Sequence, residues 1–361
     1  MAKAKTLVGL DVHASKVVAA ILDAETGELR FGRLPGGNER ALTLCAGLAP
    51  PVRVTYEAGP TGFGLARALA AADVDCLVAA PGKIPRAAQD RVKTDRRDAE
   101  HLVRLLMAGK LEPVRVPSTA EEALRDLVRA REDVRGDLMR ARHRVSKLLL
   151  RHDRRFADGQ RAWSQRHRDW LARIELDDPL AQLVLRDHLA AVEAQLIRRD
   201  ELERQIAESV PDSPWSELVP RLRCLRGIDT LTAVGLCAEV GDFERFRRPG
   251  ELMSYLGLVP CEHSTGERRR LGAITKSGSR HARRLLVEAA WHYRLGPRPS
   301  RELSRRQAGQ PEPVIAIAWK AQVRLGRSWR RLAEERGKRR TLVAVAVARE
   351  LAGFVWAVAQ A

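Results

Sequence analysis

A change in the spacing of apolar residues near residue 118 constrains this chain more than any other feature. Before it, short apolar runs rich in β-branched residues alternate with turns and short helical patterns. After it, apolar residues recur at spacings of three and four from about 118 to 152, and again from about 180 to 210. Runs of the first kind predict strands, and spacing of the second kind predicts amphipathic helices. We therefore expect an α/β layer over 5–110, followed by two long helices that pair as an antiparallel coiled-coil hairpin.

The first apolar runs predict the strands of a mixed sheet. Thr6–His13 and Lys16–Asp23 lie on either side of a short polar turn, which indicates a β-meander. Val52–Pro60 predicts a further strand with Glu57 at its carboxyl end, and ligands bind at such ends in open α/β sheets. Asp11 interrupts the first run, and a carboxylate in a central strand is costly to bury unless it is paired or coordinates a metal. The alternative is a strand-end Asp11 that faces solvent.

The stretch Lys93–Ala99 places two carboxylates where a helical pattern begins. Asp95 and Asp98 are three residues apart, so on a helix they lie on one face and could share a divalent cation. Hard cations such as Mg²⁺ bind through oxygen ligands, often one or two carboxylates together with phosphate oxygens and water. Helix capping explains the same pattern, since Thr94 or Asp95 could cap the first turn and acids there favour the helix dipole. The stretch alone leaves both interpretations open.

The charge balance indicates a polyanionic partner. Among 361 residues, 64 are Lys or Arg and 46 are Asp or Glu, a formal net charge of +18. Nucleic acid is the first candidate for such a partner. An anionic membrane surface is the rival, but no signal peptide or uninterrupted apolar span is evident. Thr341–Val358 comes closest and is interrupted by Arg349 and Glu350, so we expect a buried helix there. Five scattered cysteines without zinc or disulfide spacing favour a reducing cytoplasm.

Two further segments have compositions that suggest nucleic-acid contact. Between Arg140 and Arg168 there are ten Lys or Arg and two acids, with Trp163 and Trp170 nearby. A charge run is usually a solvated face, but one-sided charge beside aromatic residues favours contact with a nucleic-acid backbone. Leu222–Leu236 predicts a helix, a glycine-containing hairpin and a second helix, which resembles a helix-hairpin-helix, although any αα-hairpin can carry such a turn.

A polar turn at His263–Gly266 lies inside a basic segment. From 264 to 284 there are seven Lys or Arg and one acid. An exposed hydroxyl among arginines could attack a phosphodiester, with the cations stabilising the developing charge. His263 is a poor base for Ser264, because adjacent residues of an extended chain point to opposite faces. The alternative is a Ser-Thr-Gly turn that binds phosphate without chemistry.

These motifs together resemble a known family. The motifs Gly9–Val12 with Lys16, Tyr56–Gly59 and Lys93–Ala99 look like the three acidic motifs of the DEDD insertion-sequence transposases of the IS-one-ten family, also described as bridge-RNA-guided recombinases. The block Gly257–Gly278 is similar to the second signature region of that family. The match spans nearly the whole chain in the expected order. It implies an α/β RNase H-like (RuvC-like) N-terminal domain, an α-helical coiled-coil middle and a mostly α-helical C-terminal transposase domain with the helix-hairpin-helix.

The resemblance also implies roles for individual residues. Four acids would form a tetrad that binds a divalent metal, Mg²⁺ or Mn²⁺, and one serine would attack DNA and form a covalent phosphoserine link. Members of the family act as multimers, here a homodimer or tetramer, with a structured guide RNA that pairs with donor and target DNA. We therefore expect a cytoplasmic, nucleoid-associated recombinase without a membrane partner. The acids are Asp11, Glu57, Asp95 and Asp98, and the serine is Ser264.

The same resemblance suggests domain boundaries and nucleic-acid contacts. We expect a metal-binding domain over 1–115, linker helices over 116–212 and a domain with the serine over 213–361, with prolines near 211–220 at the second boundary. Activity should then depend on two domains, since the acids and Ser264 lie far apart in the sequence. The expected contacts with nucleic acid are Arg96, Arg97, Arg142, Lys147, Arg151, Arg268, Arg269, Arg270 and Lys276.

Two departures and two rival functions follow. Ser277-Gly278-Ser279 stands where relatives often have Gly followed by Asn or Asp, and Thr265 next to Ser264 could be the attacking hydroxyl instead. The first rival is a hydrolytic RuvC-like, structure-specific nuclease without a covalent intermediate. It would need the four acids but not Ser264. The second rival is a non-catalytic nucleic-acid scaffold, which leaves the position of the acids at strand ends and a helix start unexplained.

Overall fold

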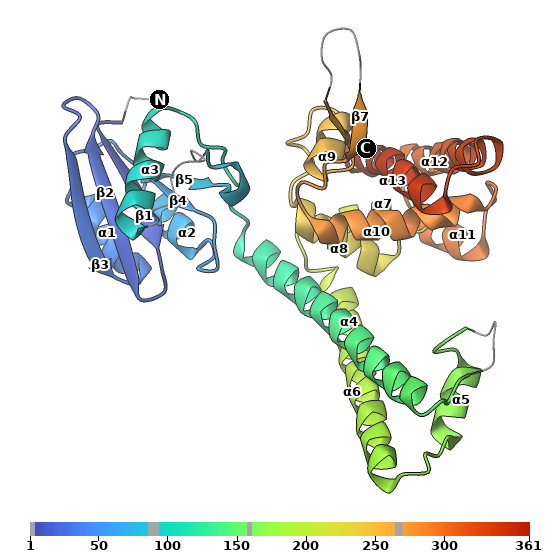
Figure 1. Ribbon diagram of the computed structural model, residues 1–361. Helices are drawn as coiled ribbons and strands as arrows, with labels where there is room; N and C mark the ends of the chain where they lie inside the picture. Colours follow the sequence, from blue (N-terminus) through green and yellow to red (C-terminus); the bar gives the residue numbers. More distant parts are fainter. Residues whose placement is uncertain (1–3, 86–93, 157–160, 264–269) are drawn as a thin grey trace. The chain divides into compact units, whose positions relative to one another are not determined.

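The computed structural model describes residues 4–85, 94–156, 161–263 and 270–361. Contacts within the chain divide it into two compact units, Met1–Ser118 and Thr119–Ala361 (Figure 1). The two long helices expected from the sequence and the C-terminal helices both belong to the second unit. The finer division into three domains stays a prediction.

Within the described residues, five strands of the first unit form one mixed sheet in the order β3-β2-β1-β4-β5. The first three strands are antiparallel neighbours, which confirms the predicted meander, and β4 and β5 continue the sheet parallel to β1. This sheet with its helices fits the predicted RNase H-like α/β domain. The elements are β1 (Thr6–Val12), β2 (Lys16–Asp23), β3 (Leu29–Pro35), α1 (Asn38–Ala46), β4 (Val52–Glu57), α2 (Gly64–Ala71), β5 (Asp75–Ala79) and α3 (Asp95–Met107).

Helices cover both faces of this sheet. Side chains alternate along each strand, so neighbouring residues of β1 are buried in different cores. Val8 and Leu10 of β1 are buried in one core with residues of α1 and α2. Leu7 is buried in a second core with residues of α3, on the opposite face. The odd-numbered positions of β1 therefore face α3, and Asp11 follows this alternation.

Gly9 allows α3 to lie directly against β1. A Cβ atom at this position would come within 2.3 Å of the Ala99 carbonyl oxygen and 2.7 Å of the Val103 backbone nitrogen. Any larger residue would have to displace the helix. Gly9 thus sets the spacing between the strand that carries Asp11 and the helix that carries Asp95.

The second unit begins with two long helices that lie side by side and run in opposite directions (Figure 1). They are α4 (Thr119–Arg151) and α6 (Pro179–Ser209), which confirms the helices predicted from apolar spacing. Apolar residues from both helices share one core, among them Leu138, Val145 and Val192. A short helix between them, α5 (Gln165–Arg173), was not predicted. Packing of the coiled-coil type stays a prediction.

The remaining elements form a mostly helical body around α13. This helix is long and apolar enough to cross a membrane by length and composition. Val347, Leu351 and Val355 are nevertheless buried where it packs against α9, α10 and α12, which confirms the predicted core helix. The elements are α7 (Leu218–Leu222), α8 (Thr230–Val240), α9 (Pro249–Tyr255), β6 (Pro260–Glu262), β7 (Leu271–Ile274), α10 (Arg280–Ala290), α11 (Arg301–Gln307), α12 (Glu312–Arg330), a π-helical turn (Arg331–Glu335) and α13 (Arg340–Ala359).

The segment Leu222–Leu236, predicted as a helix-hairpin-helix, begins at the last residue of α7 and continues through a turn into α8. Gly227 in the turn has a φ of 83°. Asp229 caps α8 by accepting a hydrogen bond from the Thr232 backbone nitrogen at 2.8 Å. Leu225 and Ile228 of the turn are buried. The glycine turn and the second helix are confirmed, whereas the first helix ends at Leu222 instead of beginning there. The role of a DNA-binding hairpin stays a prediction.

Candidate active site

Two predicted acids lie at the carboxyl ends of neighbouring parallel strands. The pairing of β1 with β4 aligns Leu10 with Tyr56, and both side chains are fully buried in the core with α1 and α2. Asp11 and Glu57 are the next residues of the two strands, so strand alternation points both toward the face that α3 covers. This is the edge of the sheet where the sequence predicted a ligand site.

The other two predicted acids lie in the first turn of α3. Thr94 caps the helix, with its hydroxyl accepting a hydrogen bond from the Arg97 backbone nitrogen at 3.3 Å. The capping interpretation is therefore correct for Thr94, and it leaves the Asp95 side chain to make other contacts. Asp95 and Asp98 are both partly exposed in this turn.

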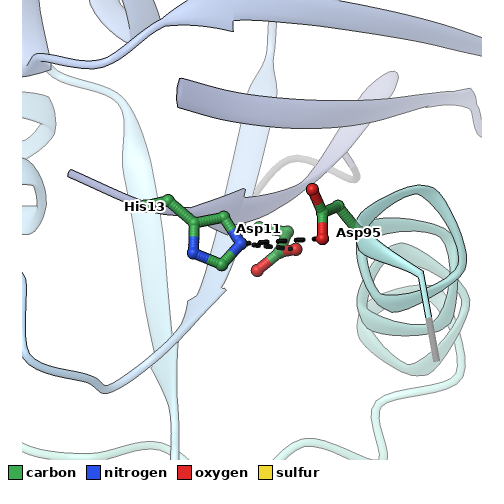
Figure 2. A group of neighbouring side chains, drawn as sticks. All are labelled: Asp11, His13 and Asp95. Carbon is green, nitrogen blue, oxygen red and sulfur yellow. Dashed lines mark hydrogen bonds and ion pairs between the residues drawn. The ribbon is translucent and has the colours of Figure 1, made fainter. Parts of the chain in front are cut away.

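Asp11, His13 and Asp95 converge at this point (Figure 2). Each offers one ligand atom, and these three atoms all lie within 4.8 Å of one another. The His13 Nε2 atom lies 3.3 Å from Asp11 Oδ2 and 3.8 Å from Asp95 Oδ1. Lys16 donates a hydrogen bond to the other oxygen of Asp95. Two carboxylates and two nitrogen groups thus form one polar cluster at the end of β1.

The electrostatics of the cluster differ between its two carboxyl groups. Partial burial raises the pKa of Asp11 above its ordinary value; His13 opposes this shift, and the charges of Asp95 and Asp98 add to it. The hydrogen bond from Lys16 lowers the pKa of Asp95. Asp98 therefore lies close enough to act on Asp11, and Lys16 and His13 offset the repulsion among the acids.

The donor set fits a divalent metal ion. Two ligands of one Mg²⁺ ion lie at most about 4 Å apart, since each bond is about 2.1 Å long. The present spread of up to 4.8 Å needs only a small contraction. Carboxylate oxygens suit Mg²⁺ and Mn²⁺, and imidazole nitrogen is a common ligand of transition metals. Asp11 and Asp95 would hold such an ion, with His13 either as a further ligand or as the partner that orients Asp11.

The remaining predicted residues of the tetrad lie outside this group of three. Glu57 is exposed at the end of β4, and Asp11 lies near the same carboxyl end of the neighbouring strand β1. Asp98 lies one turn along α3 from Asp95. Their role as metal ligands stays a prediction. His13 was not predicted, although its position two residues after Asp11 places both side chains on the same side of an extended chain.

The predicted nucleophile lies outside the described residues, as do Thr265, Arg268 and Arg269. The segment that contains them connects β6 and β7, which pair as an antiparallel hairpin. Beside it the His263 backbone nitrogen donates to the Arg270 carbonyl oxygen at 2.9 Å. Arg270 and Lys276, two of the predicted contacts with nucleic acid, are exposed.

The backbone requires a glycine at Gly278, in the last signature motif. Gly278 has a φ of 65°, and a Cβ atom there would lie 2.1 Å from the Tyr255 carbonyl oxygen. Arg283 donates hydrogen bonds to the carbonyl oxygens of Leu256 and Gly278 at 3.1 and 3.2 Å. The motif thus holds the end of α9 against the start of α10.

The basic residues predicted as nucleic-acid contacts have different environments. The Arg96 guanidinium lies over the Phe31 ring, 3.9 Å from its centre. Lys147 and Arg151 of α4 are exposed. Arg142 is partly buried, with its guanidinium 4.9 Å from the centre of the Trp163 ring.

The tryptophans near these basic residues pack against other side chains. The His167 ring lies 5.3 Å from Trp163 and 5.6 Å from Trp170, measured between ring centres. Phe156 contacts the rings of both His167 and Trp170. The sequence argument used Trp163 and Trp170 beside the one-sided charge as support for contact with a nucleic-acid backbone, whereas the structure packs their rings around α5. The prediction of nucleic-acid contact in this segment therefore depends on the neighbouring basic side chains alone.

A polar cluster in the second unit was also missed by the sequence argument. The Glu132 carboxylate of α4 accepts a hydrogen bond from Arg284 of α10 at 2.6 Å. His281 of α10 lies between two acids, 3.8 Å from Glu132 and 3.7 Å from Glu239 of α8. Arg129 of α4 donates to Glu239 at 3.3 Å. The three helices are far apart in the sequence, and no local pattern relates the residues of one to those of another.

Comparison with known proteins agrees with this arrangement. A model of DEDD transposases of the IS110 type matches residues 8–152, and a model described as Transposase IS116/IS110/IS902 family matches residues 219–302. The putative transposase y4qE of Sinorhizobium fredii is 43% identical over 361 residues, covering 99% of this chain and 89% of the relative. The transposase of insertion sequence element IS1533 from Leptospira borgpetersenii is 33% identical over 344 residues, covering 93% of this chain and 99% of the relative. The chain therefore belongs to the IS110 family of DEDD transposases, enzymes that cleave and transfer DNA strands and whose family implies the use of a divalent metal ion.

Proposed function

We propose that this transposase cuts and rejoins DNA through a serine–DNA intermediate, with a metal-binding acidic tetrad. The tetrad is Asp11, Glu57, Asp95 and Asp98, the ion is Mg²⁺ or Mn²⁺, and the nucleophile is Ser264. The convergence of Asp11, His13 and Asp95 at the end of β1 carries this proposal. A divalent ion bound there would neutralise charge on the scissile phosphate and favour loss of the proton of the attacking hydroxyl.

The chain's own residues divide the work. Before an ion binds, His13 and Lys16 contact the carboxylates of Asp11 and Asp95 and balance their charge. The Ser264 hydroxyl oxygen would attack phosphorus and form the serine–phosphate bond as the bond to one sugar oxygen breaks, and that oxygen leaves with a proton as a free hydroxyl. A hydroxyl of the recipient strand would then attack the phosphoserine and release Ser264. The phosphodiester energy is kept, so the reaction needs no ATP.

We propose further that a structured guide RNA and a multimeric state belong to this function. The net charge of +18 supports a large polyanionic partner. The exposed Lys147 and Arg151 on α4 are candidates for RNA or DNA backbone contact. We place α4 and α6 in a coiled-coil linker over 116–212, between a metal-binding domain over 1–115 and a domain with the serine over 213–361. In the latter domain, α7 and α8 would act as a DNA-binding helix-hairpin-helix.

The covalent intermediate gives the sharpest test. Incubation with Mg²⁺ and a nicked DNA substrate that stalls rejoining should leave protein bound to labelled DNA through denaturing electrophoresis. Ser264→Ala should abolish this adduct, and Thr265→Ala should retain it. Asp95→Asn should also abolish it, because the metal site loses a ligand. If Ser264→Ala still yields the adduct while Thr265→Ala does not, the nucleophile is Thr265.

The hydrolytic alternative predicts different products. A RuvC-like nuclease would release free 5′-phosphate and 3′-hydroxyl ends and leave no adduct. Its activity would need Asp95 but not Ser264. Cleavage by the Ser264→Ala variant at the wild-type rate, without adduct in either protein, would establish that alternative.

A further inference from the structure

The exposed face of α12 carries a row of cations without acids. Between 313 and 331 the sequence contains no Asp or Glu. Five basic residues in this region are exposed: Lys320, Arg324, Arg327, Arg330 and Arg331. Four of them, at 320, 324, 327 and 331, follow the spacing of one helix face. Among the described residues, only Arg324 of these five forms an ion pair, with Glu350 of α13 at 2.9 Å.

This row differs from the paired arginines on α6 and on the middle of α4. On α6, Arg204 pairs with Glu201 and Glu208 one turn away on either side. On α4, Arg135 pairs with Glu132 in the same way. Such pairs neutralise a solvated helix face at little energetic cost. The cations of α12 have no such partners on their own helix, so this face keeps its positive charge.

An exposed aromatic side chain lies beside the row. Trp319 is 47% exposed and adjoins Lys320. The other tryptophan of α12, Trp329, is buried against Trp291 with ring centres 5.3 Å apart. Packing therefore explains Trp329 but leaves the Trp319 ring open to a ligand. An open aromatic face within a row of cations is the usual composition of a single-strand binding surface.

The surface is hollowed on both sides of Arg324. One hollow of about 560 Å³ lies between Trp319, Lys320, Arg327 and Arg331. A second of about 750 Å³, lined mostly by apolar side chains, extends from Arg324 to Gly272 of β7 and to Lys276 just after it. Both hollows share Arg324 and Glu350. The face of α12 and the β6–β7 hairpin therefore line adjoining hollows, and Ser264 belongs to the segment that connects β6 with β7 in the sequence.

The dimensions suit a short stretch of DNA strand. From Lys320 to Arg331 the helix axis advances about 16 Å, at about 1.5 Å per residue. One strand of a duplex places a phosphate every 3.4 Å or so, and an extended single strand places them further apart. The row can therefore contact about three to five successive phosphates.

We infer that the exposed face of α12 binds a single strand of DNA next to the bond that is cut. Lys320, Arg327 and Arg331 contact its phosphates, and a base stacks on Trp319. The strand is single because stacking on an aromatic ring requires a base that has left its duplex neighbours. The π-helical turn that follows α12 agrees with this role, since such turns are frequent at functional sites. The inference rests on the proposed function, because the position next to the cut bond depends on the assignment of Ser264 in the segment between β6 and β7.

Binding of the full-length protein to a labelled single-stranded DNA oligonucleotide tests the inference, with a chelator present to prevent cleavage. The triple variant Lys320→Gln, Arg327→Gln, Arg331→Gln should reduce the slope of log K against the logarithm of the salt concentration by about two. Each lost phosphate contact on a single strand reduces this slope by about 0.7. Trp319→Ala should weaken binding roughly tenfold, and Trp319→Phe should restore most of it. Thermal unfolding should be unchanged in all of these variants.

A charge-matched control separates a specific surface from the overall charge. Arg204 and Arg305 each pair with an acid on their own helix, and Arg221 pairs with Glu217 at the N-cap of α7. Their triple Gln variant loses the same three positive charges and should bind with nearly the wild-type salt dependence. Equal losses in the two triple variants would overturn the inference. It would also be overturned if the α12 variants lost binding to an RNA strand of the same sequence but not to DNA.

The adduct experiment keeps this inference separate from the proposed function. Ser264→Ala should bind the single strand as well as the wild type does and form no adduct. If the α12 variants bind normally while Ser264→Ala abolishes the adduct, the inference fails and the proposed function stands. If the α12 variants lose binding while Ser264→Ala retains the adduct, the binding surface stands and the nucleophile assignment fails.

Discussion

Lys16 donates a hydrogen bond to Asp95 and so joins the first residue of β2 to the first residue of α3. The two residues are 79 positions apart in the sequence. The contact holds the start of α3 over the carboxyl end of β1, where Asp11 lies. It also places a positive charge where a metal ion would bind, so Lys16 occupies one oxygen of Asp95 until an ion displaces it.

Replacing Lys16 by Gln should therefore strengthen metal binding. Removal of a competing cation from a partly exposed carboxylate should lower the Mn²⁺ concentration for half-saturation by about fivefold, a modest effect because solvent screens the charge. Mn²⁺ titration followed by electron paramagnetic resonance measures this change. Lys83→Gln is the control, since Lys83 pairs with Glu112 instead. Weaker Mn²⁺ binding by Lys16→Gln would mean that Lys16 supports the site.

Gly9→Ala should damage the first unit and the metal site together. The added Cβ atom would lie 2.3 Å from the Ala99 carbonyl oxygen, so α3 must move away from β1. Overpacking of this kind costs about 1–3 kcal/mol of stability. The same movement carries Asp95 away from Asp11, and Mn²⁺ binding should weaken as well. Urea unfolding and Mn²⁺ titration on one preparation measure both effects.

Gly32→Ala provides the matched control for this change. Gly32 lies in β3 of the same sheet, and the nearest atom to an added Cβ would be the Ala19 Cβ at 4.0 Å. We expect its stability and its Mn²⁺ affinity to match those of the wild type. If Gly9→Ala behaved like Gly32→Ala, the close approach of α3 to β1 would not be what positions Asp95.

The local parts of this site could be predicted from the sequence. Strand alternation and the helix start depend on neighbouring residues, so Asp11, Glu57 and the cap at Thr94 were placed on the correct elements. The convergence of His13 and Lys16 on Asp95 depends on how α3 packs on the sheet, and no spacing in the sequence encodes it. The assignment of Ser264 rests on resemblance alone, since it lies outside the described residues.

The parts of the fold that were missed have similar causes. The strands of the β6–β7 hairpin have only three and four residues, too few to show alternation. Helix α5 has only nine residues with several basic side chains, and the sequence argument treated most of this segment only as part of a basic run. The cluster of Glu132, Glu239 and His281 joins three helices through tertiary contacts alone. Long helices with regular apolar spacing, such as α4 and α6, were predicted correctly because their signal extends over many turns.

Trp163→Ala should destabilise the region around α5 rather than weaken nucleic-acid binding. The Trp163 ring packs on His167 and under the Arg142 guanidinium, and its backbone nitrogen donates to His167 at 3.0 Å. We expect α5 to lose about 1–3 kcal/mol of local stability, measured by amide hydrogen exchange. Trp319→Ala is the control, because that exposed ring supports no core.

The exposed basic residues at the end of α4 should affect nucleic-acid binding and leave local stability unchanged. A double variant, Lys147→Gln with Arg151→Gln, should weaken nucleic-acid binding and reduce its salt dependence without changing hydrogen exchange in α5. Both side chains are exposed on α4, so their loss leaves the core intact. Unchanged binding in this variant would show that the basic segment is only a solvated face.

The stability of the second unit should fall in acid through Glu239. Burial of this carboxyl raises its pKa, but His281 and Arg129 outweigh that effect and hold the pKa at about 2, against 4.5 for an ordinary Glu. The folded state therefore favours the ionised form. The contribution of ionised Glu239 to the free energy of unfolding is fully present above pH 4.5 or so, and it is lost as the pH falls toward 2. The difference in pKa corresponds to roughly 3 kcal/mol.

Comparison with Glu239→Gln isolates this contribution from that of other acids. The variant should exchange the amides of α8 and α10 faster than the wild type at pH 6, and the difference in opening free energy should shrink toward zero as the pH falls to 3 and below. Glu217→Gln is the control, because Glu217 forms an exposed ion pair with Arg221 that contributes little. A difference that stays constant with pH would mean that the Glu239 side chain stabilises α8 and α10 by packing and not by its charge.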